Sequence, residues 1–288
     1  MKIGIIGVGF VGGATAEVLK QCHQLYLYDK YKSPYNKEEN LKELAENSDY
    51  VFICVPTPMK LTGEIDSTNI HNSLKNLLEF VIKTGRNPKD ILIIIRSTSV
   101  PGTTSKLESI YPFRFSFNPE FLREKYAIED MKNTNRIIIG SDNQEDGEKI
   151  SQIYKIGFPN AKYILTDAKT AEMIKYAANC MLVGQIALAN ELYLVCSSMK
   201  IDYNEVKEAI LYDLRIGRNI DVPGPDGDFG FGGKCFPKDL NALIFKSKEE
   251  GYCPNLLEAI WNLNLEVRKD KDWLKIDGAT STRNFGEN

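Results

Sequence analysis

A glycine-rich loop that ends in a cysteine carries the most reactive chemistry of the sequence, Gly230-Phe231-Gly232-Gly233-Lys234-Cys235. Pro237 follows and predicts the first turn of a helix, which places the thiol at a helix N-terminus with lysines at 234 and 238. These features lower a thiol pKa and favour the thiolate. Asp239 lies one turn further, on the same predicted helix face. We interpret Cys235 as a nucleophile, with Gly230, Phe231 and Gly232 lining the space for a substrate; a cysteine in a structural turn is the alternative.

A second motif lies at the start of the chain, where Gly7-Val8-Gly9-Phe10-Val11-Gly12 has the pattern G-x-G-x-x-G. It follows a predicted strand and opens a predicted helix, which is the context of a dinucleotide-binding turn. Gly7 permits the tight turn, Gly9 the approach of a pyrophosphate, and Gly12 close helix–strand packing.

Asp29 ends the next predicted strand, seventeen residues after Gly12. A carboxylate there is expected to bind the ribose hydroxyls of NAD, with a plain turn residue as the alternative. Lys30 follows and weakens the expected selection against NADP. A nucleotide-binding turn and a thiolate in one chain predict an oxidation through a covalent adduct. A thiolate adds to an aldehyde to give a thiohemiacetal, hydride transfer to NAD gives a thioester, and water releases an acid.

The secondary structure that must position these residues changes along the chain, from alternating strands and helices to helices alone. Up to residue 166, β-rich and helix-like segments alternate, which predicts βαβ units and a parallel sheet. The expected strands are 2–6, 25–28, 50–55, 91–96, 113–117, 137–140 and 163–165, and the expected helices there are 11–20, 68–83 and 104–109. Later segments predict only helices, at 168–199, 202–211, from Pro237, and at 254–274.

The expected fold class is therefore α/β, a Rossmann-like parallel-sheet NAD domain followed by an all-helical region. We place the NAD domain at 1–166 and the helical central region, which carries Cys235, at 167–276. A polar, frayed tail is expected at 277–288. The apolar last helix, 254–274, is expected to bury one face against a partner and to form a homodimer.

Composition excludes several classes of partner. Lys and Arg number 36 against 39 Asp and Glu, a net charge of −3, which argues against nucleic acid as the main partner. The apolar stretch 177–195 holds Asn179, Gln185, Asn190 and Glu191, which argues against a membrane span, and the N-terminus shows no secretory pattern. Six scattered cysteines without a CxxC, and two histidines, argue against a metal site and predict a reduced, cytoplasmic chain.

Taken together, these segments resemble the nucleotide-sugar dehydrogenases. The matching segments are Gly7–Gly12, Val55-Pro56-Thr57-Pro58, 96–103 (RSTSVPGT), 118–124 (NPEFLRE), 171–179 with 190–191, and the cysteine loop to Asp239. They span most of the chain, and their combination is more specific than any single motif. The resemblance implies a long central dimerisation helix and the double oxidation of a sugar C6 alcohol to a carboxylate with NAD. UDP-glucose is the favoured substrate.

The resemblance also implies roles for single residues. Cys235 is the nucleophile, and Lys175 and Asn179, one helical turn apart, contact the substrate and stabilise an oxyanion. Asp239 orients the lysine and the hydrolytic water, while Thr98 and Glu124 serve as acid–base groups, directly or through water. The remaining implied cofactor residues are Phe10, Val11, Val55, Pro56 and Thr57, together with Thr98 and Glu124. The remaining implied substrate residues are Glu120, Phe121, Leu122 and Arg123.

Structural alternatives exist for several of these residues. Lys175 could pair with Glu172 or Glu191, and Glu124 could pair with Lys125 on the surface. Arg215 and Arg218, which flank Gly217, are expected either to contact a phosphate or sugar of the ligand or to lie on a solvated face.

The resemblance further implies an α/β nucleotide domain after the last helix, and the chain ends fourteen residues past 274, so we expect that domain to be lacking.

Two other hypotheses compete with a nucleotide-sugar dehydrogenase. A two-electron hydroxyacid dehydrogenase would need no cysteine, and a catalytically idle NAD-binding module would need none of the reactive groups.

Overall fold

The computed structural model describes residues 1–217 and 219–281, which form two compact units. The first unit contains residues 1–57 and 67–175, and the second contains 58–66, 176–217 and 219–281. The boundary lies within helix α7 (Ala168–Ser198), so both units use that helix. The junction expected between 166 and 167 coincides instead with the start of α7. Arg218 and residues 282–288 of the expected tail lie outside the described residues.

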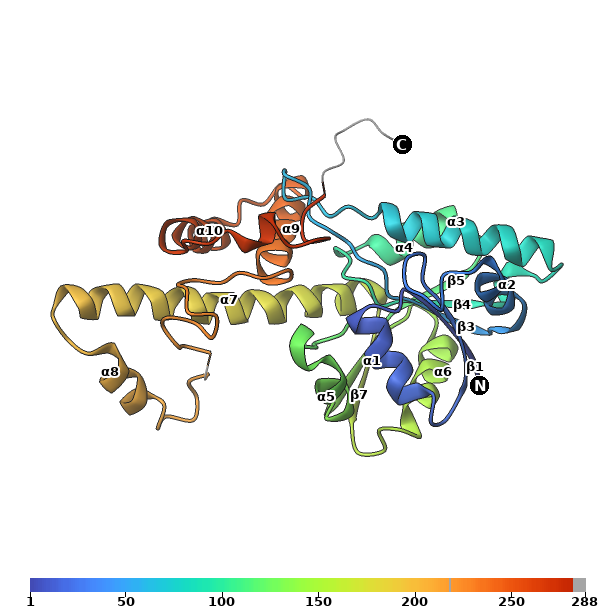
Figure 1. Ribbon diagram of the computed structural model, residues 1–288, viewed down its shortest axis with the longest axis horizontal. Coiled ribbons are helices and arrows are strands. Elements are labelled where there is room, and N and C mark those ends of the chain that lie inside the picture. The colour runs from blue at the N-terminus through green and yellow to red at the C-terminus, as the bar shows by residue number, and fades with distance from the viewer. Residues whose placement is uncertain (218, 282–288) are drawn as a thin grey trace. The chain divides into compact units, whose positions relative to one another are not determined.

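The first unit is built on a seven-stranded sheet with the strand order β2-β1-β3-β4-β5-β6-β7 (Figure 1). The strands are β1 (Lys2–Ile6), β2 (Gln24–Tyr28), β3 (Tyr50–Ile53), β4 (Leu92–Ile95), β5 (Arg114–Phe117), β6 (Arg136–Gly140) and β7 (Lys162–Thr166). Neighbouring strands are parallel, as the sequence predicts, except that β5 and β6 meet antiparallel. The connection between these two holds the 3-10 turn Glu124–Tyr126 and the six-residue helix α5 (Ala127–Lys132).

Helices cover both faces of this sheet. α2 (Glu38–Asn47), α3 (Thr68–Lys83) and α4 (Thr103–Ile110) pack on one face. The other face carries α1 (Phe10–Leu19), α5 (Ala127–Lys132) and α6 (Gln144–Lys155). The sequence pattern predicts α1, α3 and α4 but misses the other three, which are polar on their exposed sides. α2 buries only three residues and α5 only two.

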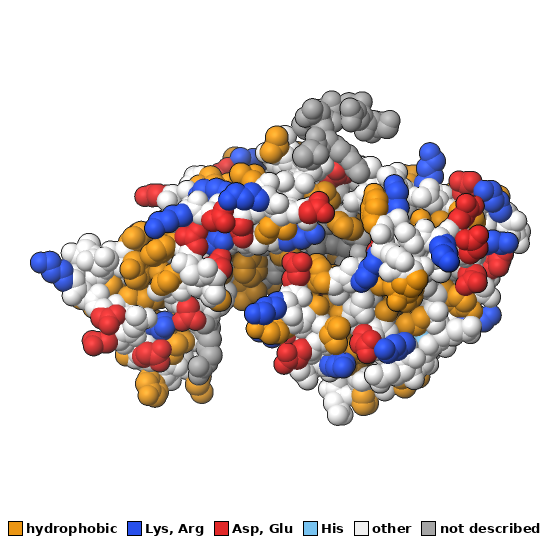
Figure 2. Space-filling model, in the orientation of Figure 1, with side chains coloured by type: hydrophobic (Ala, Val, Ile, Leu, Met, Phe, Trp, Pro, Cys, Tyr) orange, Lys and Arg blue, Asp and Glu red, His pale blue; other side chains and the backbone are white. Residues whose placement is uncertain are grey.

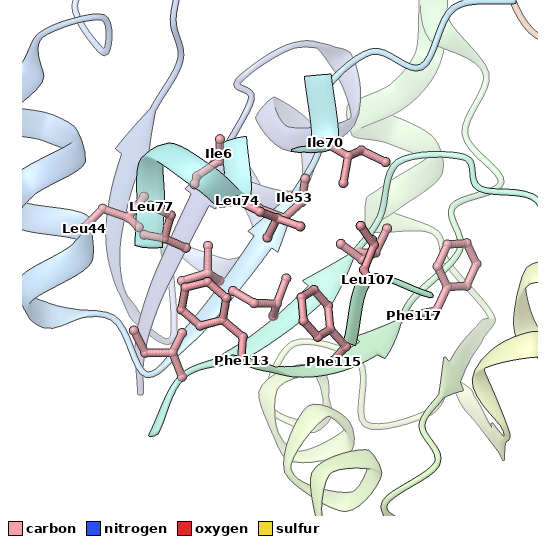
Figure 3. Packing of buried hydrophobic residues seen from close by; sticks show 14 of the residues in the cluster. Ile6, Leu44, Ile53, Ile70, Leu74, Leu77, Leu107, Phe113, Phe115 and Phe117 are labelled. Atoms are coloured by element: carbon pink, nitrogen blue, oxygen red, sulfur yellow. The ribbon is translucent and has the colours of Figure 1, made fainter. Parts of the chain in front are cut away.

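The core alternates between the two faces of each strand. Ile93 and Ile95 of β4 join the cluster under α2, α3 and α4, whereas Leu92 and Ile94 join the opposite cluster. Figure 3 shows the first cluster, where Leu74 of α3 lies beside Ile53 of β3. Burial on both faces accounts for the continuous apolar run of β4. The carboxyl edge of the sheet, which carries the predicted nucleotide residues, is therefore rigidly supported.

The second unit is helical and contains the rest of α7 with α8 (Tyr203–Ile210), α9 (Phe236–Glu249) and α10 (Asn255–Val267). α10 ends at Val267, so the sequence prediction of a helix reaching 274 is wrong. The backbone of Arg268 is extended, and the next two N–H groups donate to the Asp228 carboxylate at 3.1 and 2.8 Å. This side chain replaces the helical carbonyls as acceptor and ends the helix.

The apolar face of α10 is largely covered within its own unit. Leu257, Ile260 and Trp261 pack against Val183 and Leu240. The sequence predicts that a partner covers this face; the structure leaves only Leu256 and Leu265 of α10 as exposed large apolar side chains.

The first residues of the expected tail are ordered. Trp273 is buried and lies 5.3 Å from Trp261, ring centroid to ring centroid. The Met59 N–H donates to the Ala279 carbonyl at 2.9 Å, and the Ser281 hydroxyl donates to Asp66 at 2.7 Å. Residues 277–281 therefore pair with the loop 58–66 rather than fray.

α7 is the one helix in the described part of the chain that is long and apolar enough to cross a membrane by length and composition. Core helices of globular proteins pass the same test. Asn179 and Asn190 of this helix are buried inside the second unit, where polar side chains find partners that lipid would not supply.

Candidate active site

The glycine turn of the first unit forms a cradle with one open position. Gly7 has φ +91°, and a Cβ there would lie 2.7 Å from the Cys54 carbonyl oxygen. A Cβ on Gly12 would lie 1.9 Å from the Gly7 carbonyl oxygen, so both glycines are required by the fold itself. A Cβ on Gly9 would meet nothing within 4 Å. The backbone at Gly9 is thus open to a ligand.

Helix α1 begins directly at this opening. Gly9 is its N-cap, no side chain caps the helix, and its first turn, which starts with Phe10 and Val11, contains no acidic residue. Uncapped N–H groups and the positive end of the helix dipole suit a diphosphate. The residues present therefore fit the pyrophosphate of a dinucleotide.

Asp29 closes the second side of the cradle at the end of β2. One carboxylate oxygen accepts the Val8 N–H at 2.7 Å, and the other accepts the N–H groups of Tyr31 and Lys32 at 2.9 and 3.0 Å. The strand end is thereby tied to the glycine turn. A carboxylate has about four lone-pair positions, so one remains for a ribose hydroxyl. Lys30 is exposed, with its ammonium 5.4 Å from the Tyr31 ring centroid.

The next strand ends bring the other predicted cofactor residues to the same edge. The Thr57 hydroxyl donates to the Thr98 carbonyl at 3.0 Å, and the Ser97 hydroxyl donates to the Val55 carbonyl at 2.7 Å. The Asn69 amide donates to the Pro56 carbonyl at 2.9 Å. The segments after β3 and β4 are therefore held together at the carboxyl edge of parallel strands, where open α/β sheets bind ligands.

Glu120, which follows β5, forms a buried ion pair with Lys175 of α7. The Lys175 ammonium lies 2.9 Å from Glu120 Oε1, and both side chains are about 5% exposed. The same ammonium lies 5.5 Å from the Phe121 ring centroid, and the Leu122 N–H donates to the other Glu120 oxygen at 2.7 Å. A buried lysine held in this way presents its charge in a fixed direction.

Glu172, the alternative partner considered for Lys175, is engaged elsewhere. Its carboxylate accepts the Gly102 N–H at 2.6 Å and both the N–H and the hydroxyl of Thr104 at 2.8 and 2.6 Å. It thereby supplies the N-terminus of α4 with acceptors. Burial raises the pKa of this carboxyl above its ordinary value, although the same hydrogen bonds oppose the shift.

Two predicted residues after Glu120 lie on the surface. The Arg123 guanidinium is 69% exposed and forms an ion pair with Asp130 at 2.6 Å. Glu124 is exposed in a short 3-10 turn (Glu124–Tyr126). Their roles toward cofactor and substrate stay predictions.

In the second unit, Cys235 is the N-cap of α9, as the sequence predicts. Its carbonyl accepts the Asp239 N–H at 2.8 Å. Asp239 is buried, and its two carboxylate oxygens accept from Asn179 and from Lys238, each at 2.5 Å. One carboxylate therefore fixes the Asn179 amide of α7 and the lysine that follows the cysteine.

The glycines before Cys235 make room for protein side chains. A Cβ on Gly230 would lie 2.2 Å from Asn264 Oδ1, and one on Gly232 would lie 2.2 Å from an Arg268 nitrogen. Phe231 is buried with Trp261 and Leu240. The sequence interpretation, that these residues clear space for a substrate, therefore omits a packing reason for both glycines.

Sequence reasoning missed a buried polar network under β4 and β5. Arg96 is 5% exposed, and Asn118 Oδ1 accepts both from Arg96 and from the Tyr154 hydroxyl, the latter at 2.6 Å. Asn118 lies two residues before Glu120, so the network holds the strand end that carries the Glu120–Lys175 pair. Burial raises the pKa of Tyr154 to about 12. The one sequence signal for this network is Arg96 itself, a charged residue at the end of an apolar segment, which needs hydrogen-bond acceptors when it is buried.

The remaining candidates are peripheral. Arg215 is exposed and bonds to Asp213, while Arg218 lies outside the described residues. Within 1–217 and 219–281, no group of three or more His, Cys, Asp or Glu side chains has the arrangement to hold a metal ion.

A Rossmann-like unit with an open dinucleotide cradle, followed by a helical unit with a cysteine at a helix start, defines an NAD-binding dehydrogenase-like architecture. Residues 23–157 match the NAD binding domain of the UDP-glucose/GDP-mannose dehydrogenase family, and residues 169–266 match the central domain of the same family. The chain belongs to this family, and its cofactor is NAD.

Named relatives support the assignment. The chain is 37% identical over 219 residues to a UDP-glucose 6-dehydrogenase of Rickettsia conorii, covering 74% of this chain and 47% of that protein. It is 32% identical over 308 residues to one of Haloferax volcanii, covering 92% of this chain and 69% of that one. A UDP-glucose dehydrogenase structure from Pyrobaculum islandicum has a TM-score of 0.80 at 26% identity, covering 92% of this chain and 68% of that one. The chain spans about half the length of several relatives, including those of Rickettsia conorii and Rickettsia bellii.

Proposed function

We propose that the protein oxidises the C6 alcohol of a nucleotide sugar to the carboxylate, with Cys235 as the covalent nucleophile. The observation that carries the proposal is the buried arrangement at the start of α9, where Asp239 bonds both Asn179 and Lys238 beside the cysteine. Burial of a carboxylate, an amide and a lysine is tolerated here because they hydrogen-bond to one another, and these bonds fix the three groups close to the cysteine. UDP-glucose is the favoured sugar, because several relatives are named UDP-glucose 6-dehydrogenases.

The reaction requires two hydride removals at one carbon and one water. NAD supplies the hydride acceptor for each oxidation when it is bound. After the first oxidation, the Cys235 sulfur adds to the aldehyde carbon, and the carbonyl oxygen takes a proton to complete the thiohemiacetal. Loss of the second hydride and of the hydroxyl proton leaves a thioester. Attack by water breaks the carbon–sulfur bond, which releases the acid and returns the thiolate with release of a proton. A bound adduct keeps the aldehyde from escaping between the oxidations.

Lys175 and Asn179 are assigned to the oxyanion that forms at each attack. They lie one turn apart on α7 and so on one face of that helix. The Lys175 ammonium is held at 2.9 Å from Glu120 Oε1, and the Asn179 amide keeps a second N–H beyond its bond to Asp239. Thr98 and Glu124 are assigned to proton transfer, directly or through water. Glu120, Phe121, Leu122 and Arg123 are assigned to the substrate.

A homodimer formed through α7 fits the surface of the second unit. Apolar side chains at heptad spacing lie exposed along this helix, and Figure 2 shows hydrophobic side chains gathered over the part of the unit that holds α7 and α8. The exposed members of the row are Met181, Leu188, Leu192 and Val195, and the exposed Met199 follows directly after the helix. We expect a dimer by light scattering at micromolar concentration, and Leu188→Glu should convert it to a monomer. A wild-type monomer would refute this assembly.

We place the protein in the cytoplasm because none of its six cysteines is bonded to another.

The function is tested with the whole chain, NAD and a panel of nucleotide sugars. NADH formation with UDP-glucose is expected, with two NADH for each uronic acid. Cys235→Ala should lose the second oxidation and any covalent adduct, and Cys235→Ser should leave sugar attached to the protein, because an alkoxide is a poorer leaving group than a thiolate. Mass spectrometry of the intact protein reports the adduct. Wild-type rates of uronic acid formation by Cys235→Ala would refute the covalent route and favour a two-electron dehydrogenase.

A further inference from the structure

We propose that Asn264, Arg268 and Asp272 are positioning residues that clamp the glycine loop and so fix the Cys235 thiol for attack. The inference rests on the nucleophilic role proposed for Cys235. Arg268 and Asp272 lie beyond residues 169–266, which match the central domain of the family. We refer to the three side chains as the loop clamp.

Asn264 holds the middle of the loop. Its Oδ1 accepts the Phe231 N–H at 2.7 Å, and its Nδ2 donates to the Phe231 carbonyl at 3.0 Å. One buried amide therefore satisfies both backbone groups of one residue, as a neighbouring strand would. Asn190 of α7 adds an acceptor for the Gly230 N–H at 3.0 Å.

Asp272 holds the end of the loop, two residues before the cysteine. Its two carboxylate oxygens accept the Gly233 N–H at 3.1 and 2.9 Å. Gly233 has φ +76°, a conformation that side chains rarely adopt, so the backbone direction changes there. A charge-assisted hydrogen bond at this position restricts the path of the chain into Cys235.

Arg268 connects the two ends of the loop. Its guanidinium is 3% exposed and lies 2.7 Å from Asp226 and 3.3 Å from Asp272. It also donates to the carbonyls of Phe229 and Asp270 at 3.3 and 2.9 Å. A buried guanidinium between two carboxylates is strongly disfavoured when one partner is removed.

The loop composition and the clamp require each other. A Cβ on Gly232 would lie 2.2 Å from an Arg268 nitrogen and 2.4 Å from Asp272 Oδ1, and one on Gly230 would overlap Asn264. The backbone of this loop belongs to no helix or strand, so side chains must hold it. Because a displacement of about 1 Å at a reacting group costs about a hundredfold in rate, the clamp should control the rate without touching the substrate.

The test compares Asp272→Asn, Arg268→Lys and Asn264→Asp with the control Lys275→Gln, which removes an exposed ion pair to Asp270 in the same segment. The first readout needs neither NAD nor sugar. Iodoacetamide labelling of the whole chain as a function of pH, resolved by peptide mass spectrometry, compares Cys235 with Cys253, an exposed reference thiol. In the clamp variants, the Cys235 profile should shift toward that of Cys253, while the control keeps the wild-type profile.

The second readout is steady-state turnover. The clamp variants should lose about ten- to hundredfold in kcat with KM nearly unchanged. Folded variants with wild-type labelling and kcat would overturn the clamp, and a raised KM at unchanged kcat would make these residues substrate ligands instead. If Arg268→Lys fails to fold, Gly232→Ala perturbs the same contact from the loop side. The labelling profile of Cys235 and the kcat of that variant then test the clamp. Labelling decides the clamp even if the wild type oxidises no nucleotide sugar, so failure of the proposed function is recognised separately.

Discussion

Alanine substitutions at two glycines of the first turn should separate the needs of the cofactor from the needs of the fold. Gly9 has φ −73° and ψ −156°, which any residue adopts, and an added methyl would meet no protein atom within 4 Å. Gly9→Ala should therefore fold, with a change in unfolding free energy within about 1 kcal/mol. At Gly12 the added methyl would lie 1.9 Å from a backbone carbonyl oxygen that cannot move aside. Gly12→Ala should cost about 3 kcal/mol or more.

NAD affinity should be the property that the Gly9→Ala substitution reduces. The methyl of Gly9→Ala would occupy the space through which a pyrophosphate approaches the start of α1. Losing one hydrogen bond to a charged phosphate costs about 1.5–3 kcal/mol, which is about a ten- to hundredfold loss of affinity. Titration calorimetry with NAD and thermal denaturation measure the two effects on the same samples. Wild-type NAD affinity in Gly9→Ala would contradict the role of Gly9 in binding the pyrophosphate. A wild-type Tm in Gly12→Ala would contradict the close packing at Gly12.

Three further outcomes are expected. Asp29→Asn should narrow the preference for NAD over NADP, because the amide no longer repels a 2′-phosphate; equal wild-type binding of the two cofactors would contradict the role of Asp29. Burial raises the pKa of Cys54 and of Cys180 to about 12, so both should stay protonated and resist alkylation at pH 8 while Cys253 reacts, and early labelling of Cys54 would contradict the packing. Because burial raises the pKa of Glu172, the folded state holds its proton more tightly, and unfolding free energy should fall as pH rises from about 4.5 through the raised pKa. Glu172→Gln should lose that slope in denaturant titrations, and an unchanged slope would assign it to another group.

The sequence predicts the nucleotide half of the fold well because its signals are local. The G-x-G-x-x-G turn, Asp29 and the run 91–95 each lie within or beside one strand, and period and turn chemistry identify such segments. The reversal between β5 and β6 is not local, since it depends on how far α5 returns the chain. The same limit explains why α2 is missed, as only three of its residues are buried.

The end of α10 shows a second limit. Residues 254–274 look helical by composition, yet the helix stops at Val267 because Asp228, some forty residues earlier, binds the N–H groups of Lys269 and Asp270. The pairing of 277–281 with the loop 58–66 spans more than two hundred residues and leaves no periodic signal. Long-range polar contacts of this kind depend on the assembled fold, and propensity alone does not reveal them.

The cysteine loop combines both situations. Its local sequence is enough to place Cys235 at a helix N-terminus, and the structure confirms that position. The reason for its glycines is different from the one that the sequence suggests, because Gly230 and Gly232 lie against Asn264, Arg268 and Asp272. A flexible loop would give the thiol many directions, whereas these buried contacts leave it few. On the proposed roles, the reactivity of Cys235 would depend on residues that follow it by about thirty positions as much as on the lysines beside it. Changes at those distant positions are then expected to alter kcat before they alter substrate binding.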